Sequence, residues 1–194
     1  MRCLTLRAEV AGRLEASGGR VDAHVLERVP AEDAGCLAWA TLSQAHWLHA
    51  RGVAGAAIDL EALLAMGDRL IQVAPDLERG RAWEARGVAR GIVPAPLAER
   101  FSSLAEGEQR SPAQGAALDL TEARRRASDR LGPAVAMAEL VYGPAGDEVA
   151  WRRTLEAVVA ARGARTGVDS VEDAAAQRRA AELLLAGPPA PDRW

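Results

Sequence analysis

Apolar side chains recur at every third or fourth position along most of the chain, which is the spacing of one buried helix face. The pattern is strongest from Ala56 to Ala74, where Pro75 ends it. It recurs from Pro30 to Ala50 and from Asp147 to Arg162. These three segments are therefore predicted to be amphipathic helices.

Gly and Pro residues divide the chain into about nine or ten such helices, joined mostly by short turns. Residues that favour strands are scarce, since Phe and Tyr occur once each. We expect an all-α fold of antiparallel helix pairs, arranged as an irregular tetratricopeptide-like repeat. It would form one helical domain over residues 1–186, with a Pro-rich extended tail over residues 187–194.

Polar residues predict where several helices begin. Asp76 is the expected N-cap of a helix that ends near Gly91. Ser170 has an acid three residues on, as in a capping box, and is expected to begin the last helix. Residues Glu106–Leu118 show little periodicity and are predicted to be the longest loop, before a helix over Leu120–Leu131.

The composition excludes several chemistries. All basic residues are Arg, so no Schiff base can form on a Lys and no Walker A loop is possible. The net charge of −3 gives no reason to expect a nucleic-acid partner. No apolar run approaches the roughly 20 residues of a membrane span. We expect a soluble cytoplasmic protein as the sequence is written, or a periplasmic one if a signal peptide has been removed.

Two segments, Gly67–Pro75 and Glu122–Pro133, resemble the second helix of a tetratricopeptide unit, because each ends in the helix-stopping Pro of that repeat. The two Pro residues lie 58 positions apart, which is not a multiple of the roughly 34-residue period, so the repeats are expected to be irregular.

Softer packing patterns lie in Gly80–Gly87, Glu139–Tyr142, Asp147–Trp151, Leu155–Val159 and Ala175–Leu184. In these segments the chain is similar to the TatT family, the tetratricopeptide-like component associated with TRAP-type substrate-binding proteins. The likeness spans about Ala56 to Ala186. It implies an all-α fold that self-associates and docks to a partner protein.

The three histidines are the candidates for metal chemistry. His46 and His49 lie three residues apart on one predicted helix and so share a face, and His24 is a third candidate. A zinc site would need Cys36 or Asp59 to be brought in by the fold. We predict ordinary, partly buried histidines, with no metal site and no cofactor.

The two cysteines allow a structural or a catalytic role. The chain has two cysteines, too few for a disulfide framework, and Cys36 is expected to be a small core residue. The alternative is that Cys36 and a histidine form a nucleophile and base, but Cys36 lies in the middle of a predicted helix among apolar residues.

Trp and Arg residues are the candidates for binding. Trp39, Trp47 and Trp83 are expected in the core, with the alternative that one or two line a groove between helix pairs. Arg81, Arg86 and Arg90 recur along the predicted helix that carries Trp83, and they could bind a carboxylate of a ligand or a partner, with surface charge as the alternative. The predicted partner-binding residues are therefore Trp47, Trp83, Arg86 and Arg90, and no catalytic residue is predicted.

These patterns favour a helical scaffold that binds a protein or peptide partner and could form a homo-oligomer, rather than an enzyme. Two alternatives remain open. One is a small metal-binding protein or enzyme that uses His46 and His49. The other is a carrier with an apolar cavity lined by Trp.

Overall fold

The computed structural model describes residues 11–12, 15–16, 21–51, 57–102, 110–162 and 168–188. Every regular element in these ranges is helical, which confirms the all-α prediction. The short elements are the 3-10 turns η2 (Ala31–Asp33) and η3 (Leu77–Arg79) and the π-helical turn η4 (Ala138–Tyr142). The α-helices are α2 (Ala23–Glu27), α3 (Ala34–Arg51), α4 (Ala57–Val73), α5 (Arg81–Gly91), α6 (Ala95–Ser102), α7 (Pro112–Arg126), α8 (Gly132–Met137), α9 (Glu148–Ala160) and α10 (Val168–Ala186).

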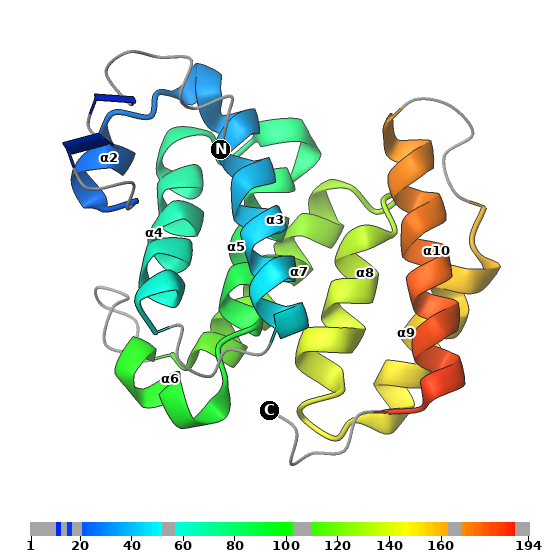
Figure 1. The fold of residues 1–194 in the computed structure, drawn as a ribbon. Helices are drawn as coiled ribbons and strands as arrows, with labels where there is room; N and C mark the ends of the chain where they lie inside the picture. The colour runs from blue at the N-terminus through cyan, green and yellow to red at the C-terminus, as the bar shows by residue number, and fades with distance from the viewer. Residues whose placement is uncertain are drawn as a thin grey trace.

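Two apolar cores share the helix formed by α8 and η4. Figure 1 shows this helix between α3, α4 and α5 on one side and α9 and α10 on the other. The first core is formed by helices α2, α3, α4, α5 and α6, and Leu37 and Leu63 are fully buried in it. The second joins α8, α9 and α10 around Trp151. Val135 of α8 belongs to the second core, whereas Leu140 of η4 belongs to the first. The seam between the two cores therefore runs along α8 and η4.

Small residues let α5 pack closely against its neighbours. A β-carbon on Gly87 would come within 2.8 Å of Leu120 Cγ on α7. Gly67 of α4 lies against Arg86 of α5, where a β-carbon would be 3.1 Å from the Arg86 Cα atom. These contacts explain the mixture of small and large residues along α5, because only a missing side chain allows the backbones to approach this closely.

The predicted loop over Glu106–Leu118 is wrong from residue 112 onward, and residues 103–109 lie outside the described ranges. Helix α7 begins at Pro112 because Ser111 forms a capping box: its hydroxyl accepts from Gln114 N at 3.3 Å, and the Gln114 side chain accepts from Ser111 N at 3.0 Å. Pro at the first helical position reinforces this start. The helix ends at Arg126, where Ala127 leaves the helical conformation, five residues before the predicted end at Leu131.

Two other predicted helix starts are displaced. Asp76 makes no capping hydrogen bond, and the chain instead turns through η3 and Gly80 (φ 105°) before α5 begins at Arg81. A glycine suits this position because a left-handed conformation costs it little. Ser170 lies inside the first turn of α10, which begins at Val168.

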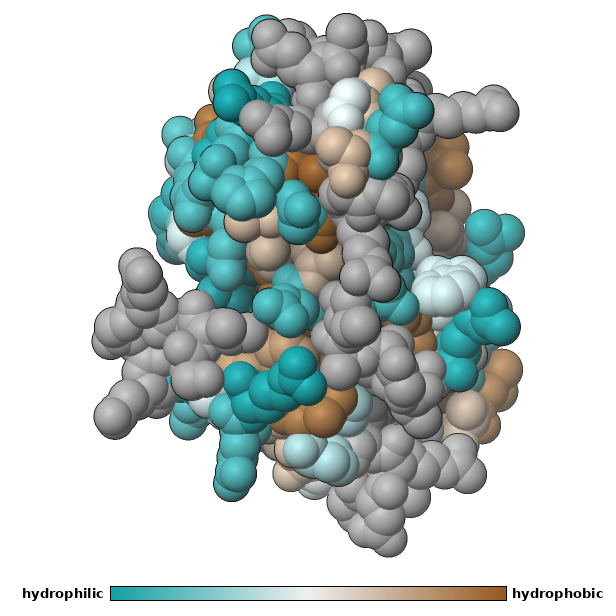
Figure 2. All heavy atoms as spheres, turned by 60° about the vertical axis from the view of Figure 1, so that its left-hand side comes forward, coloured by the Kyte–Doolittle hydropathy of each residue, from teal (hydrophilic) through white to brown (hydrophobic). Residues whose placement is uncertain are grey.

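The surface of the described residues mixes polar and apolar areas. Figure 2 turns the side that carries α2 and α4 forward and shows hydrophilic side chains interspersed with small apolar areas. Within the described ranges, none of the helices combines the length and apolar character that crossing a membrane requires. The predicted tail over residues 187–194 is described only at Gly187 and Pro188, which follow the end of α10 without continuing it.

Candidate functional site

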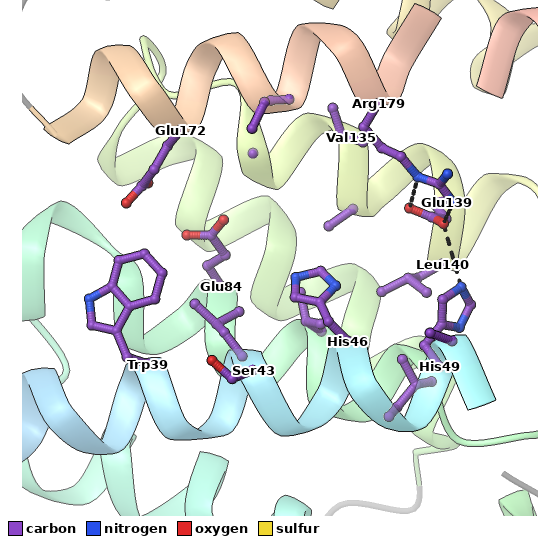
Figure 3. Close-up of a pocket in the computed structure, with 18 of the residues that line it drawn as sticks. Trp39, Ser43, His46, His49, Glu84, Val135, Glu139, Leu140, Glu172 and Arg179 are labelled. Carbon is purple, nitrogen blue, oxygen red and sulfur yellow. Dashed lines mark hydrogen bonds and ion pairs between the residues drawn. The ribbon is translucent and has the colours of Figure 1, made fainter. Parts of the chain in front are cut away.

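A cleft of about 530 Å³ lies at the seam between the two cores. Helices α3 and α10 face each other across it, with α5, α8 and η4 between them (Figure 3). The apolar lining comes from both cores, with Leu42, Val88 and Leu140 on one side and Val135 and Ala176 on the other. Its size and largely apolar walls are those of a small-molecule site, and a boundary between packed units is a usual place for one.

The π-helical turn η4 shapes one wall of the cleft. Gly143 N donates to Ala138 O at 2.9 Å and Asp147 N donates to Tyr142 O at 2.9 Å, both spanning five residues instead of four. Glu139 and Leu140, which lie in this turn, both line the cleft. Such turns interrupt the regular register of a helix and occur often at functional sites.

One end of the cleft is closed by Glu139, which lies between His49 and Arg179 (Figure 3). The Nε2 atom of His49 is 3.4 Å from the Glu139 carboxylate, and Arg179 of α10 makes a close ion pair with the same group. Burial alone would raise the pKa of Glu139, but the hydrogen bonds from His49 and Arg179 outweigh it and lower this pKa to about 2. Glu139 is therefore a fixed carboxylate at neutral pH that ties α3 to α10 through η4.

The other end carries a cluster of four charged side chains beside Trp39. Arg81 lies over the Trp39 ring at 4.9 Å, donates to Glu84 at 3.1 Å and donates to both carboxylate oxygens of Glu172 at 2.7 and 2.6 Å. Arg130 donates to Glu84 at 2.5 Å and to Glu172 at 3.4 Å. The two arginines and two glutamates thus neutralise one another and join α5, α10 and the turn before α8.

Burial has opposing consequences in this cluster. It would lower the pKa of Arg81, but the neighbouring carboxylates of Glu84 and Glu172 outweigh it and raise that pKa. The Nη1 atom of Arg130 is buried without a hydrogen-bond partner. Asp173, next to Glu172, accepts from Leu131 N at 3.0 Å and so holds the start of α8 against α10.

Ser43 and His46 project from the middle of α3 into the cleft (Figure 3). Both side chains are exposed to solvent, and within the described part of the chain neither makes a hydrogen bond to another residue. Packing of the imidazole against the cleft walls lowers the pKa of His46, mainly because its partial burial disfavours the charged form; Glu139 opposes this shift and His49 adds to it. The imidazole is therefore neutral at neutral pH, with one donor and one acceptor nitrogen.

The structure places the four predicted partner-binding residues in two separate regions. Trp83 donates from Nε1 to Pro75 O at 2.9 Å. The guanidinium carbons of Arg86 and Arg126 lie 5.0 and 5.4 Å from the centre of its ring. The prediction that Trp39 and Trp47 lie in the core is wrong: they are 45% and 52% exposed on α3, where both line a second hollow of about 510 Å³. The assignment of these residues to partner binding stays a prediction.

Arg86 and Arg90, also predicted to bind a partner, form an internal ion cluster between α4, α5 and α7. Arg86 donates to both oxygens of Asp119 at 2.8 and 2.7 Å. Arg90 donates to Asp119 and to Asp68, each at 3.2 Å. Both guanidinium groups are thus held by carboxylates of this chain, and neither lines the cleft.

The three histidines do not converge. His46 and His49 share the cleft as their spacing predicts, whereas His24 is exposed on α2 and lies 3.8 Å from Glu27. Among the described residues, no three His, Cys, Asp or Glu side chains are grouped so as to hold a metal ion. Cys36 is half-buried, as a residue packed against the first core, but it is disulfide-bonded and so is no free nucleophile.

Most of the cleft was not predicted from the sequence. The sequence predicts that Arg81 could bind a carboxylate, and in the fold it pairs with Glu84 and Glu172 of this chain, whereas no sequence pattern indicates Glu139 or Glu172 as site residues. Arg81 and Glu84 lie three residues apart, which indicates a helical ion pair, but nothing local connects them to Glu172. Comparison with protein-family models, with curated proteins and with solved structures gives no match.

Proposed function

We propose that this protein binds a small, largely apolar molecule in the cleft between α3 and α10. The observation that carries the proposal is the cleft itself: about 530 Å³, lined by apolar side chains of two cores, with paired charges at both ends. A cavity of this kind removes apolar ligand surface from water, which is the main favourable term in such binding. The protein would then be a carrier, and Trp39 is the tryptophan that lines its cavity.

The arrangement of the polar side chains in the cleft favours ligand binding over acid–base catalysis. Glu139 accepts hydrogen bonds from His49 and Arg179, so it is committed to both. No hydrogen bond joins Ser43 to His46 or His46 to Glu139, and these are the residues of the cleft that a nucleophile and its base would require. The described side chains of the cleft therefore supply recognition groups rather than a proton relay.

The proposal is tested by titrating the neutral dye N-phenylnaphthylamine, whose fluorescence rises in an apolar site. Ala175→Phe would place a ring in the cleft, since Ala175 lines it and is exposed. Ala174→Phe is the matched control, because Ala174 is the exposed neighbour on α10 that does not line the cleft. We expect saturable binding that weakens at least about tenfold in Ala175→Phe alone. A flat titration, or equal binding by both variants, would contradict the proposal.

A second candidate is a docking surface for a protein or peptide partner on α3. Trp39 and Trp47 are 45% and 52% exposed on this helix, and Trp is enriched among the residues that contribute most to protein–protein binding. The likeness to the TatT family supports the same proposal, as well as self-association. Affinity enrichment would compare wild type, Trp47→Ala and, as a control, Val149→Ala on the exposed face of α9. A partner kept by the control and lost by Trp47→Ala is expected; equal retention would contradict this surface.

A further inference from the structure

We infer that the ligand of the cleft is an uncharged molecule with an apolar body and one hydroxyl or primary amide group, which hydrogen-bonds to Ser43 and His46. This inference rests on the proposed function and adds the chemical class of the ligand. It follows from three observations: two solvent-exposed polar side chains to which no other described residue hydrogen-bonds, charged side chains that are already paired, and the remaining apolar lining.

Ser43 and His46 are the recognition groups. They lie three residues apart on α3, so they share one face of the helix, and both line the cleft. The charged side chains around them are all engaged with one another, whereas neither of these two makes a hydrogen bond to another described residue. A ligand can therefore use both without breaking any contact of the protein.

The charge balance of the cleft disfavours an ionised ligand. Three carboxylates line it, and three guanidinium groups are paired with them: Glu84 and Glu172 with Arg81 and Arg130, and Glu139 with Arg179. Arg81 and Arg179 each contact one further carboxylate outside the lining, those of Glu78 and Glu182. A charged ligand would therefore find no unpaired opposite charge among these groups unless it displaced one of the pairs, which is costly.

The groups around His46 explain why its imidazole is uncharged when it hydrogen-bonds to the ligand. Glu139 of η4 and Glu84 of α5 favour its protonation, while His49 of α3 and Arg179 of α10 oppose it, and burial opposes it most. A neutral imidazole and a serine hydroxyl each offer a donor and an acceptor. A ligand hydroxyl or primary amide also offers both, so it can pair with the serine hydroxyl and with either nitrogen of the imidazole.

The apolar body follows from the rest of the lining. Leu42, Val88 and Ile92 lie on the side of the first core, and Val135 and Ala176 on the side of the second. These side chains make no hydrogen bonds, so a second polar group on the ligand would lose its contacts with water without replacement. A compact hydrocarbon or aromatic body with a single polar group is the chemistry that matches.

The test is displacement of N-phenylnaphthylamine by three probes that share one fused aromatic ring system and differ only in its substituent: naphthalene, naphthol and naphthoate. It is done at about pH 7.5, above the usual histidine pKa, where naphthol is neutral and naphthoate is ionised. We expect naphthol to displace the dye at a concentration about 3- to 10-fold lower than either of the others. In Ser43→Ala and in His46→Phe this preference should fall to within about twofold.

Matched controls are Ser128→Ala and His24→Phe, which change the same residue types at exposed positions outside the cleft and should keep the full preference. Dye binding by each variant verifies that its cleft is folded. If the dye binds but naphthoate or naphthalene competes as well as naphthol, this inference is overturned and the proposed function stands. If wild-type protein does not bind the dye, both are overturned together.

Discussion

The carboxylate of Glu84 lies directly over the backbone of Gly132, where α8 begins: a β-carbon on Gly132 would come within 2.7 Å of its Oε1 oxygen. The other oxygen, Oε2, accepts hydrogen bonds from both Arg81 and Arg130. The carboxylate therefore cannot turn away from a larger residue without weakening the two contacts that neutralise the buried charges. A glycine at this position is required by the charged end of the cleft.

Gly132→Ala should consequently destabilise the protein by about 1–3 kcal/mol, because it perturbs a buried network of ion pairs. Urea denaturation monitored by circular dichroism measures this loss. In a Glu84→Ala background the same substitution has no carboxylate to displace, so its cost should largely disappear in the double-mutant cycle. An equal cost in both backgrounds would show that Gly132 is needed for another reason.

Glu139 should make stability depend on acid pH. Its pKa is about 2 in the folded protein against an ordinary value of 4.5, so folding holds the ionised form and is favoured above pH 4.5. This contribution is lost as the pH falls from about 5.5 towards 2, because the unfolded chain then binds the proton first. Near neutral pH it is on the order of 1–2 kcal/mol, since the partner Arg179 is partly exposed to solvent.

Glu139→Gln removes this titration. The difference in unfolding free energy between wild type and variant should therefore shrink as the pH is lowered through that window, which denaturation at several pH values would measure. Glu182→Gln is the control, because Glu182 contacts the same Arg179 at 3.4 Å but is largely exposed. A pH profile unchanged by Glu139→Gln, or changed equally by both variants, would contradict the role assigned to Glu139.

The helices could be predicted from the sequence where apolar spacing is regular, as in α3, α4 and α9. The start of α7 was also encoded locally, by Ser111 and Gln114, and was missed because the preceding residues show no periodicity. By contrast, the π-helical turn η4 has no sequence signal of its own, since its residues follow an ordinary helical pattern. It is defined only by hydrogen bonds that span five residues.

The site was harder to predict because its contacts join distant positions. The shared face of His46 and His49 follows from helical geometry. The carboxylate beside His49 lies 90 positions further on, at Glu139, and no local pattern indicates that distance. Arg86 and Arg90 show the opposite problem: their spacing suggests a binding face, but the fold brings Asp119 to them. Pairing between elements therefore decides which charged residues remain available for a ligand.

Close packing of α5 against α7 gives a further prediction. A β-carbon on Gly87 would come within 2.8 Å of Leu120 Cγ, and Leu120 is fully buried, so Gly87→Ala should destabilise the protein by about 1–3 kcal/mol. Gly35→Ala on α3 is the control, since nothing lies within 4 Å of the added atom and helix propensity favours Ala by up to about 1 kcal/mol. Thermal denaturation of both variants should show changes of opposite sign; stabilisation by Gly87→Ala would contradict this packing.

Asp119 offers a way to separate stability from ligand binding. Its carboxylate is 2% exposed and holds both Arg86 and Arg90, although burial raises its pKa against their influence. Asp119→Asn would leave two guanidinium groups with only Asp68, so we expect a loss of about 3 kcal/mol in urea denaturation.

Glu122→Gln on the same helix is the control for Asp119→Asn. Glu122 pairs with Arg125 and Arg126 near the surface, where such pairs contribute no more than about 1 kcal/mol. Neither Asp119 nor Glu122 lines the cleft, so both variants should bind N-phenylnaphthylamine as wild type does under folding conditions. A loss of dye binding by folded Asp119→Asn protein would instead show that the Arg86 and Arg90 cluster contributes to ligand binding, because a change in stability alone would not affect binding by protein that is folded.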